Sequence, residues 1–127
     1  RIRESKDLVS DEIDYILTFK SNISINGLRE NKEIETKVSD KNSMIEILKN
    51  LNIYTKHEGS KERIRYEYEG IRFDIDTWDK ETYPDPYLEI EVSKKEDIEK
   101  AIKLLGIDEN DITLKSLKQL REDVGLK

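Results

Sequence analysis

Charged side chains at alternate positions mark several segments of this chain, and both signs of charge are present. Arg63 and Arg65 alternate with apolar or aromatic residues, and so do Asp74 and Asp76. In an extended strand, residues two apart point to the same side of the sheet. Each segment is therefore expected to have one apolar face and one charged face. Several such strands curled together would line a channel with cations and carboxylates, which suits a polyphosphate and its divalent cations.

The basic and acidic residues of these segments have the chemistry that such a channel requires. Guanidinium groups bind phosphate oxygens in a two-pronged manner, and lysines add a point charge. Two or three convergent carboxylates suffice to hold Mg²⁺ or Mn²⁺ beside substrate phosphates. A Glu-x-Glu strand places both carboxylates on one face, roughly 7 Å apart. The basic candidates are Arg1, Arg3, Lys20, Lys61 and Arg63, with Arg65 as a further one, and the acidic candidates are Glu33, Glu35, Asp74, Asp76, Glu89 and Glu91.

A simpler interpretation of the alternation remains open. Alternating charge on a strand usually marks the solvated face of a two-layer sheet. Opposite charges on neighbouring strands would also form ordinary cross-strand pairs. His57 is the only histidine and is expected at the surface beside a turn, and Trp78 is expected to pack at a strand end or to line the mouth of a channel. No residue is assigned as a catalytic acid or base.

Composition limits the class of protein. At 127 residues the chain is expected to form one domain with a modest core, since 35% of its residues are hydrophobic and 41% are charged. The net charge of −6 argues against a nucleic-acid binder. No apolar run approaches the length of a membrane span, and no signal peptide is visible. The absence of cysteine excludes disulfides and thiolate metal sites. We therefore expect a cytoplasmic protein with no nucleic-acid or membrane partner.

The local patterns predict an α+β protein in which helices cover the outside of a curled antiparallel sheet. Glu69-Gly70 joins two alternating segments and predicts a hairpin. Ser93 and Glu96 predict a capping box, and Gly106 predicts the end of that helix. The expected strands are 13–20, 30–38, a short one at 52–57, 61–68, 71–77 and 87–92, with a loop at 21–27 and helices at about 40–50, 93–105 and 113–124.

The order of these motifs resembles the CYTH superfamily, the triphosphate tunnel metalloenzymes. The resemblance covers nearly the whole chain, and it lies in the order and spacing of the motifs rather than in any single one. The motifs are Arg1-Ile2-Arg3, Leu17-Thr18-Phe19-Lys20, Glu33-Ile34-Glu35, Lys61-x-Arg63-x-x-Tyr66, Asp74-Ile75-Asp76-x-Trp78, Tyr87-Leu88-Glu89-Ile90-Glu91, Lys103-Leu104-Leu105-Gly106 and Thr113-x-Lys115-Ser116.

The resemblance implies an antiparallel β-barrel, a triphosphate tunnel, with helices packed on the outside. It implies that basic residues in the lumen contact phosphates and that acidic residues hold Mg²⁺ or Mn²⁺ or position the basic groups. Glu89 and Glu91 match the closing Glu-x-Glu strand of the family best. The implied phosphate-binding residues are Arg1, Arg3, Lys20, Lys61 and Arg63, and the implied metal ligands are Glu89, Glu91, Asp76, Glu33 and Glu35.

Three activities are compatible with the resemblance. The first is metal-dependent hydrolysis of a triphosphate-containing small molecule, such as tripolyphosphate, thiamine triphosphate or a nucleoside triphosphate. The second is a class IV adenylate cyclase that forms cyclic AMP from ATP, and the third is a non-catalytic module that binds polyphosphate or a nucleotide. Residues 1–127 are expected to form a single CYTH-like domain that lacks the N-terminal strand with the family's Glu-x-Glu-x-Lys motif. The resemblance is also compatible with a homodimer.

Overall fold

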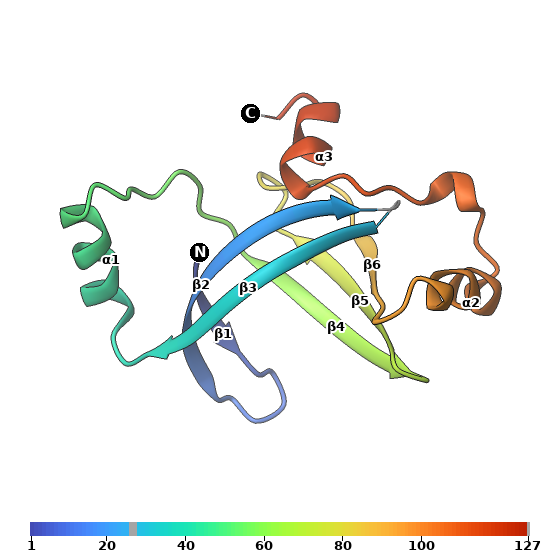
Figure 1. Cartoon of the computed structure of the whole chain (residues 1–127). Helices are drawn as coiled ribbons and strands as arrows, with labels where there is room; N and C mark the ends of the chain where they lie inside the picture. The colour runs from blue at the N-terminus through green and yellow to red at the C-terminus, as the bar shows by residue number, and fades with distance from the viewer. Residues whose placement is uncertain (26–27, 127) are drawn as a thin grey trace. The chain divides into compact units, whose positions relative to one another are not determined.

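The computed structural model describes residues 1–25 and 28–126 and divides into two compact units, residues 1–56 and 57–127. The described residues form an α+β fold with two antiparallel three-stranded sheets and three α-helices (Figure 1). Each unit contains one of the sheets. The α+β class expected from the sequence is therefore confirmed.

Unit 1 is a three-stranded meander followed by a helix. Its strands are β1 (Ile2–Lys6), β2 (Ile13–Ile25) and β3 (Leu28–Val38), hydrogen-bonded in that order. Figure 1 shows β2 and β3 as a long curved pair of strands. Helix α1 (Lys41–Asn50) begins after Asp40, whose carboxylate accepts a hydrogen bond from the Ser43 amide at 3.1 Å. This cap satisfies one of the amides that the first turn of a helix leaves without a partner.

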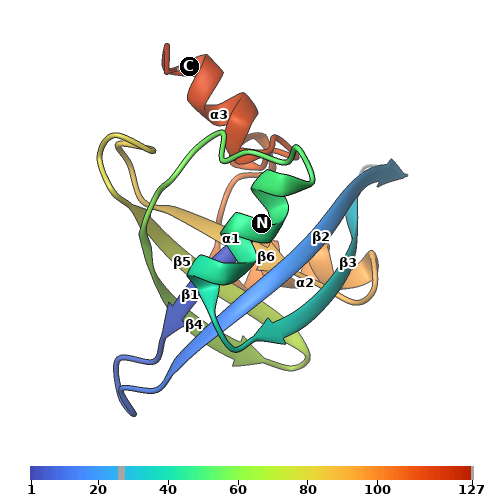
Figure 2. The same cartoon turned by 90° about the vertical axis from the view of Figure 1, so that its left-hand side faces the viewer.

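Unit 2 begins with a second meander and ends with helices. Strands β4 (Lys61–Tyr68), β5 (Ile71–Trp78) and β6 (Tyr87–Glu91) are hydrogen-bonded in that order (Figure 2). The predicted hairpin between β4 and β5 is confirmed, and Glu69 and Gly70 both have positive φ, at 49° and 78°. Two positive φ values define the tight turn that matches the twist of paired strands. Helix α2 (Glu96–Leu105), a 3₁₀ turn (Glu109–Asp111) and helix α3 (Leu117–Asp123) follow.

The buried core of unit 2 lies on the apolar face of β5. Ile71 and Phe73 alternate with the charged residues of β5, and they pack with Ala101 of α2. Ile90 and Val92 pack against this cluster. The predicted two-faced strand is therefore present, with its apolar side covered by α2 and its charged side directed the other way.

The structure corrects several predicted boundaries. Residues 21–25 of the expected loop belong to β2, because their main-chain pairing with β3 continues past Lys20; the rest of that loop, Asn26 and Gly27, lies outside the described residues. The short strand expected at 52–57 is wrong, since residues 53–60 carry no regular structure.

Two helix starts also differ from the prediction. Helix α2 begins at Glu96 after Lys95, which makes no side-chain cap, so the Ser93–Glu96 capping box is wrong because Ser93 lies two residues too early. A capping box instead joins Ser116 and Gln119, so α3 begins at Leu117 rather than near residue 113. Gly106 ends α2 as predicted, with a left-handed φ of 64°.

Gly59 lies where the chain approaches a buried hydroxyl, and we expect Gly59→Ala to destabilise the protein by about 1–3 kcal/mol. A Cβ at this position would lie 2.6 Å from Thr82 Oγ1 and 3.2 Å from His57 Nε2. Thr82 is fully buried and cannot swing into solvent. Urea unfolding of the variant would measure the loss, with Ser60→Ala as control because Ser60 binds Asp79 through its main-chain amide. An unchanged unfolding midpoint for Gly59→Ala would show that the loop adjusts at no cost.

Candidate phosphate and metal site

One face of the sheet in unit 1 carries every site residue that was predicted for this part of the chain. Arg1 pairs with Thr18 through two main-chain hydrogen bonds of 2.8 Å, and Arg3 lies opposite Ile16. Thr18 and Lys20 of β2 lie opposite residues of β3. Directly opposite residues of an antiparallel pair point to the same side. The residues that share this face include Arg1, Arg3, Ile16, Thr18, Lys20, Glu33, Glu35 and Lys37.

Two glutamates on this face accept contacts from neighbouring strand residues, one from an ammonium group and one from a hydroxyl. The Nζ of Lys20 lies 3.6 Å from a carboxylate oxygen of Glu33, its cross-strand partner. The hydroxyl of Thr18, which is 2% exposed, donates to Glu35 at 3.4 Å. Both glutamates are exposed, so their remaining oxygen lone pairs face solvent. This face can bind an anion through its cations and a cation through its carboxylates.

Unit 2 carries a second charged face, built from all three of its strands. Lys61, Arg63 and Arg65 lie on β4 opposite Trp78, Asp76 and Asp74 of β5. Glu89 and Glu91 of β6 lie opposite Asp74 and Arg72. All the site residues predicted for this part of the chain therefore share one face of one sheet: Lys61, Arg63, Asp76, Glu89 and Glu91.

Asp76 is the best-connected carboxylate of this face. It is fully buried and receives two hydrogen bonds from Arg63, Nε to Oδ1 at 2.6 Å and Nη2 to Oδ2 at 2.8 Å. The Nζ of Lys61 donates to the same Oδ2 at 3.1 Å. The prediction that Asp76 is a metal ligand stays a prediction, but both of its oxygens already accept bonds from basic groups. In this arrangement Asp76 fixes the positions of Lys61 and Arg63.

The ionisation of this cluster follows from its burial and its charges. Burial opposes the charge of Asp76, but the hydrogen bonds of Arg63 and the charge of Lys61 outweigh it, so the pKa of Asp76 lies below its usual value. Burial and the neighbouring Arg63 lower the pKa of Lys61 despite the opposing effect of Asp76. The hydrogen bonds to Asp76 raise the pKa of Arg63, which therefore stays charged at every accessible pH.

The lowered pKa of Asp76 predicts a pH-dependent loss of stability. The contribution is present above the unfolded-state pKa of 3.8 and is lost as the pH falls through the lower folded-state pKa. We expect Asp76→Asn to reduce the free energy of unfolding by about 2 kcal/mol at pH 7 and by clearly less near pH 3. Urea unfolding at both pH values would measure this, with the exposed Asp85→Asn as control. An equal loss at both pH values would contradict the prediction.

The remaining carboxylates of the unit 2 face also contact basic groups. An oxygen of Glu89 lies 3.6 Å from Nη2 of Arg63, and an oxygen of Glu91 lies 2.6 Å from Nη2 of Arg72. Asp74, which is 2% exposed, contacts Arg65 and Arg63. Asp74 belongs to the acidic set predicted from the alternation but not to the site residues implied by the resemblance. Its place in the alternation was the signal that could have identified it.

An aromatic cluster lies at the Lys61 end of the same face. The Nζ of Lys61 lies 5.0 Å from the ring centroid of Trp78. The indole of Trp78 donates to the hydroxyl of Tyr87 at 2.8 Å, and the rings of Tyr83 and Tyr87 meet edge to face. Burial raises the pKa of Tyr87, and Asp76 and Glu89 contribute to this shift. Trp78 ends β5, in agreement with the strand-end position that was one of its two expected positions, but its tyrosine partners were not predicted.

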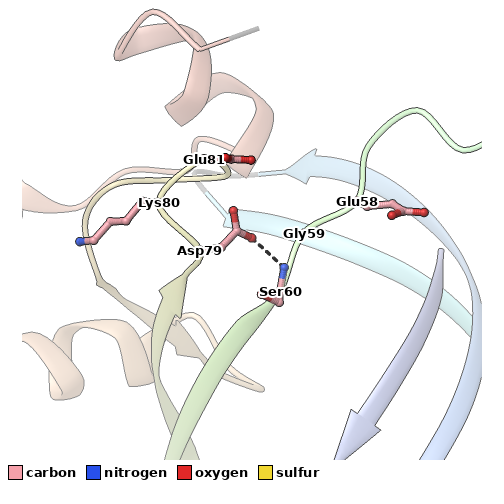
Figure 3. A pocket seen from close by; sticks show the side chains of 6 residues that line it. All are labelled: Glu58, Gly59, Ser60, Asp79, Lys80 and Glu81. Carbon is pink, nitrogen blue, oxygen red and sulfur yellow. Dashed lines mark hydrogen bonds between the residues drawn. The ribbon is translucent and has the colours of Figure 1, made fainter.

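A shallow depression lies beside the ends of β4 and β5, where Asp79 accepts a hydrogen bond from the Ser60 amide at 2.8 Å (Figure 3). Its lining contains three acidic residues and one basic residue and comprises Glu58, Gly59, Ser60, Asp79, Lys80 and Glu81. None of the predicted site residues lines it. His57 lies nearby, with Nε2 3.1 Å from the hydroxyl of Thr82, which donates to Asp79 at 2.8 Å. The buried Thr82 is a structural link in this loop.

Comparison with known proteins assigns the family. A family model of the CYTH domain matches residues 1–117. The chain belongs to the CYTH family. This CYTH domain is also similar in fold to two archaeal proteins, over 94% of its own length and 73% of each of theirs. They are a conserved hypothetical protein from Pyrococcus furiosus, with 22% identity and a TM-score of 0.73, and the PH1012 protein from Pyrococcus horikoshii OT3, with 23% identity and a TM-score of 0.74.

CYTH is a family of triphosphate-binding tunnel proteins, and it includes triphosphatases and adenylate cyclases. No curated protein matches the sequence. Across residues 1–25 and 28–126, no helix is both long and apolar enough to cross a membrane. In the same residues, no three histidine, aspartate or glutamate side chains cluster closely enough to hold a metal ion by themselves.

Proposed function

We propose that this CYTH domain binds a triphosphate-containing small molecule and hydrolyses it with the help of a divalent cation. The products would be orthophosphate and a diphosphate. The observation that carries the proposal is the fixed guanidinium of Arg63, which the buried Asp76 holds by two hydrogen bonds on a face shared with Lys61 and Glu89. A guanidinium fixed before binding loses less side-chain entropy when a phosphate arrives.

The proposed architecture is the antiparallel barrel that the family resemblance implies, with the charged faces lining its lumen. Two features of the individual sheets support this part of the proposal. Each sheet is an antiparallel meander with one strongly charged face, and on the opposite face the central strands β2 and β5 carry mostly apolar residues. An antiparallel sheet with opposite faces of this kind can close with its charged face inward.

The residues present fit a divalent cation that is shared with the substrate. Glu33 and Glu35 form one Glu-x-Glu pair and Glu89 and Glu91 the other, and each pair presents hard oxygen ligands on one face of its strand. Mg²⁺ is commonly bound by one or two carboxylates together with substrate phosphates, so a closed protein cage is not required. A bound cation would neutralise charge on the phosphate oxygens and assist attack by water.

The charge balance of the unit 2 face also favours metal dependence. The cross-strand register places four basic side chains, Lys61, Arg63, Arg65 and Arg72, beside five acidic ones, Glu67, Asp74, Asp76, Glu89 and Glu91. A triphosphate carries several negative charges, and this face alone has no positive charge to spare. A divalent cation near Glu89 and Glu91 is therefore expected to strengthen binding, while Arg63 and Lys61 orient the phosphates.

A ³¹P NMR experiment on this chain with Mg²⁺ or Mn²⁺ tests the proposed function. Tripolyphosphate is expected to give orthophosphate and pyrophosphate, and EDTA is expected to stop the reaction. Formation of pyrophosphate and a cyclic phosphodiester from ATP would show that the activity is cyclisation and not hydrolysis. Shifted or broadened signals without products would indicate a binding module. Spectra that are unchanged by the protein would refute triphosphate binding by this chain.

A further inference from the structure

Asp74 occupies the middle of the charged face of unit 2. It lies on the central strand β5, opposite Arg65 of β4 on one side and Glu89 of β6 on the other. Its side chain is 2% exposed, although every one of these neighbours is partly open to solvent. A carboxylate that is removed from water in this way is costly unless basic groups surround it.

Asp74 binds two guanidinium groups at once. Nε and Nη2 of Arg65 donate to Oδ1 and Oδ2 at 2.8 and 3.1 Å, which is a two-pronged pair. Nη1 of Arg63 lies 3.3 Å from the same Oδ2. Because Asp76 holds Arg63 from its other side, the two aspartates and the two arginines form one continuous ionic array. Asp74 is the link that fixes Arg65 beside Arg63.

Arg65 is the more exposed partner of this array. Its side chain is 42% exposed, whereas that of Arg63 is 27% exposed and that of Asp74 is 2% exposed. The carboxylate is thus beneath the guanidinium, and the guanidinium lies at the surface of the charged face. A guanidinium has five N–H donors, and the bond to Asp74 occupies the Nε and Nη2 side of the group, so other donors can reach an anion.

Arg63 and Arg65 together present two fixed charges to a ligand. They are two residues apart on β4, so their Cα atoms lie roughly 7 Å apart on the same side of the strand. This spacing suits a ligand with more than one phosphate. The Arg72–Glu91 pair on the same face differs from the Arg65–Asp74 pair. The side chain of Glu91 is 59% exposed, so water can solvate its charge without a basic partner.

We infer that Arg65 is a further phosphate-binding residue and that Asp74 is the positioning residue that holds Arg65 and Arg63 in place for a polyphosphate. The inference rests on the proposed function for its ligand. Its positioning part concerns the protein without ligand and can be tested separately. Asp74 does not touch the substrate in this arrangement, and it acts through the two arginines.

The positioning part is tested by NMR of the arginine Nε–H groups in the ligand-free protein. The Nε–H of Arg65 is expected to give a sharp, slowly exchanging signal, because Asp74 accepts its hydrogen bond. Asp74→Asn should broaden that signal while the Nε–H of Arg63, which is bonded to Asp76, keeps its own. Asp74→Glu, which restores a carboxylate, should recover part of the Arg65 signal. An Arg65 signal unaffected by Asp74→Asn would overturn the positioning role.

The binding part is tested by calorimetric titration with tripolyphosphate and Mg²⁺. Arg65→Ala is expected to weaken binding about 10-fold, and Arg65→Lys should recover only part of the loss because lysine lacks the planar fork. Lys100→Ala removes one positive charge from an exposed ion pair between α2 and Glu69 of the β4–β5 turn, and it is the matched control. Asp74→Asn is expected to weaken binding despite removing a negative charge, which a purely electrostatic role would not do.

The outcomes separate this inference from the proposed function. Tight binding by the wild-type chain and by both Arg65 variants would overturn the role of Arg65 and leave the proposed function intact. Stronger binding by Asp74→Asn would show that its charge repels the ligand and would overturn the inference. Absence of binding by the wild-type chain would refute the proposed function and, with it, the phosphate-binding role of Arg65, whatever the arginine signals show.

Discussion

Arg63→Ala is expected to weaken tripolyphosphate binding by about 10- to 100-fold, the largest effect of any single basic residue in the chain. Arg63 contacts three carboxylates of the charged face, namely Asp74, Asp76 and Glu89. It is therefore fixed more firmly than the other basic residues, and its loss also leaves Asp76 with Lys61 as its basic partner. Calorimetric titration in Mg²⁺ would measure the affinity, and ³¹P NMR would measure turnover.

In the Arg63→Ala variant, weaker binding caused by unfolding must be distinguished from weaker binding caused by loss of the guanidinium. Arg63→Lys keeps one positive charge near Asp76 but removes the planar fork, so it should fold better than Arg63→Ala and still bind weakly. Urea unfolding of both variants would report their stability. Lys100→Ala is again the control for a lost positive charge. Wild-type affinity in a folded Arg63→Ala variant would remove Arg63 from the site.

The double variant Glu89→Gln/Glu91→Gln is expected to lower metal-dependent turnover about 100-fold. Glutamine preserves the size of each side chain but removes the anionic oxygens that a hard cation prefers. Tripolyphosphate affinity measured in EDTA should be retained or should rise, because two negative charges leave the face. The measurement is a Mg²⁺ titration of turnover by ³¹P NMR, paired with calorimetry in EDTA.

A matched control tests whether the loss of turnover comes from the carboxylates of the unit 2 face or from the change in the net charge of the chain. Glu62 lies on β4 but points to the opposite side of the sheet from Lys61 and Arg63, and Glu99 is exposed on α2. Glu62→Gln/Glu99→Gln therefore removes the same charge outside the site and should leave turnover unchanged. Unaltered metal dependence in the Glu89/Glu91 variant would exclude these residues as ligands.

The alternation of charge predicted which residues share a face, and the reason is geometric. A period of two is a property of the strand itself, so Arg63, Asp76 and Glu89 could be placed on one side before any pairing was known. The hairpin at Glu69-Gly70 fixed the register of β4 and β5 by its length alone. These features depend on residues that are close in the sequence.

Features that depend on distant residues could not be predicted in this way. The contact of Asp74 with Arg63, which is not its direct cross-strand partner, depends on side-chain conformation rather than on spacing. The extension of β2 through residues 21–25 is stabilised by pairing with β3, although Ser and Asn favour turns in isolation. The start of α2 was misplaced because a Ser-x-x-Glu pattern marks a cap only if the chain turns at the serine.

The ionic array of unit 2 also determines how β4 and β5 can align as the chain folds. A one-residue slip would bring Arg63 opposite Ile75 and turn the charges toward the apolar side. A two-residue slip in one direction would set Arg65 against Arg72, and in the other direction Glu67 against Asp74, so like charges would meet in both cases. The native register pairs three sets of opposite charges and no like charges, so the side chains proposed to bind phosphate also favour the correct alignment of the hairpin, and their substitution is expected to cost folding fidelity as well as affinity.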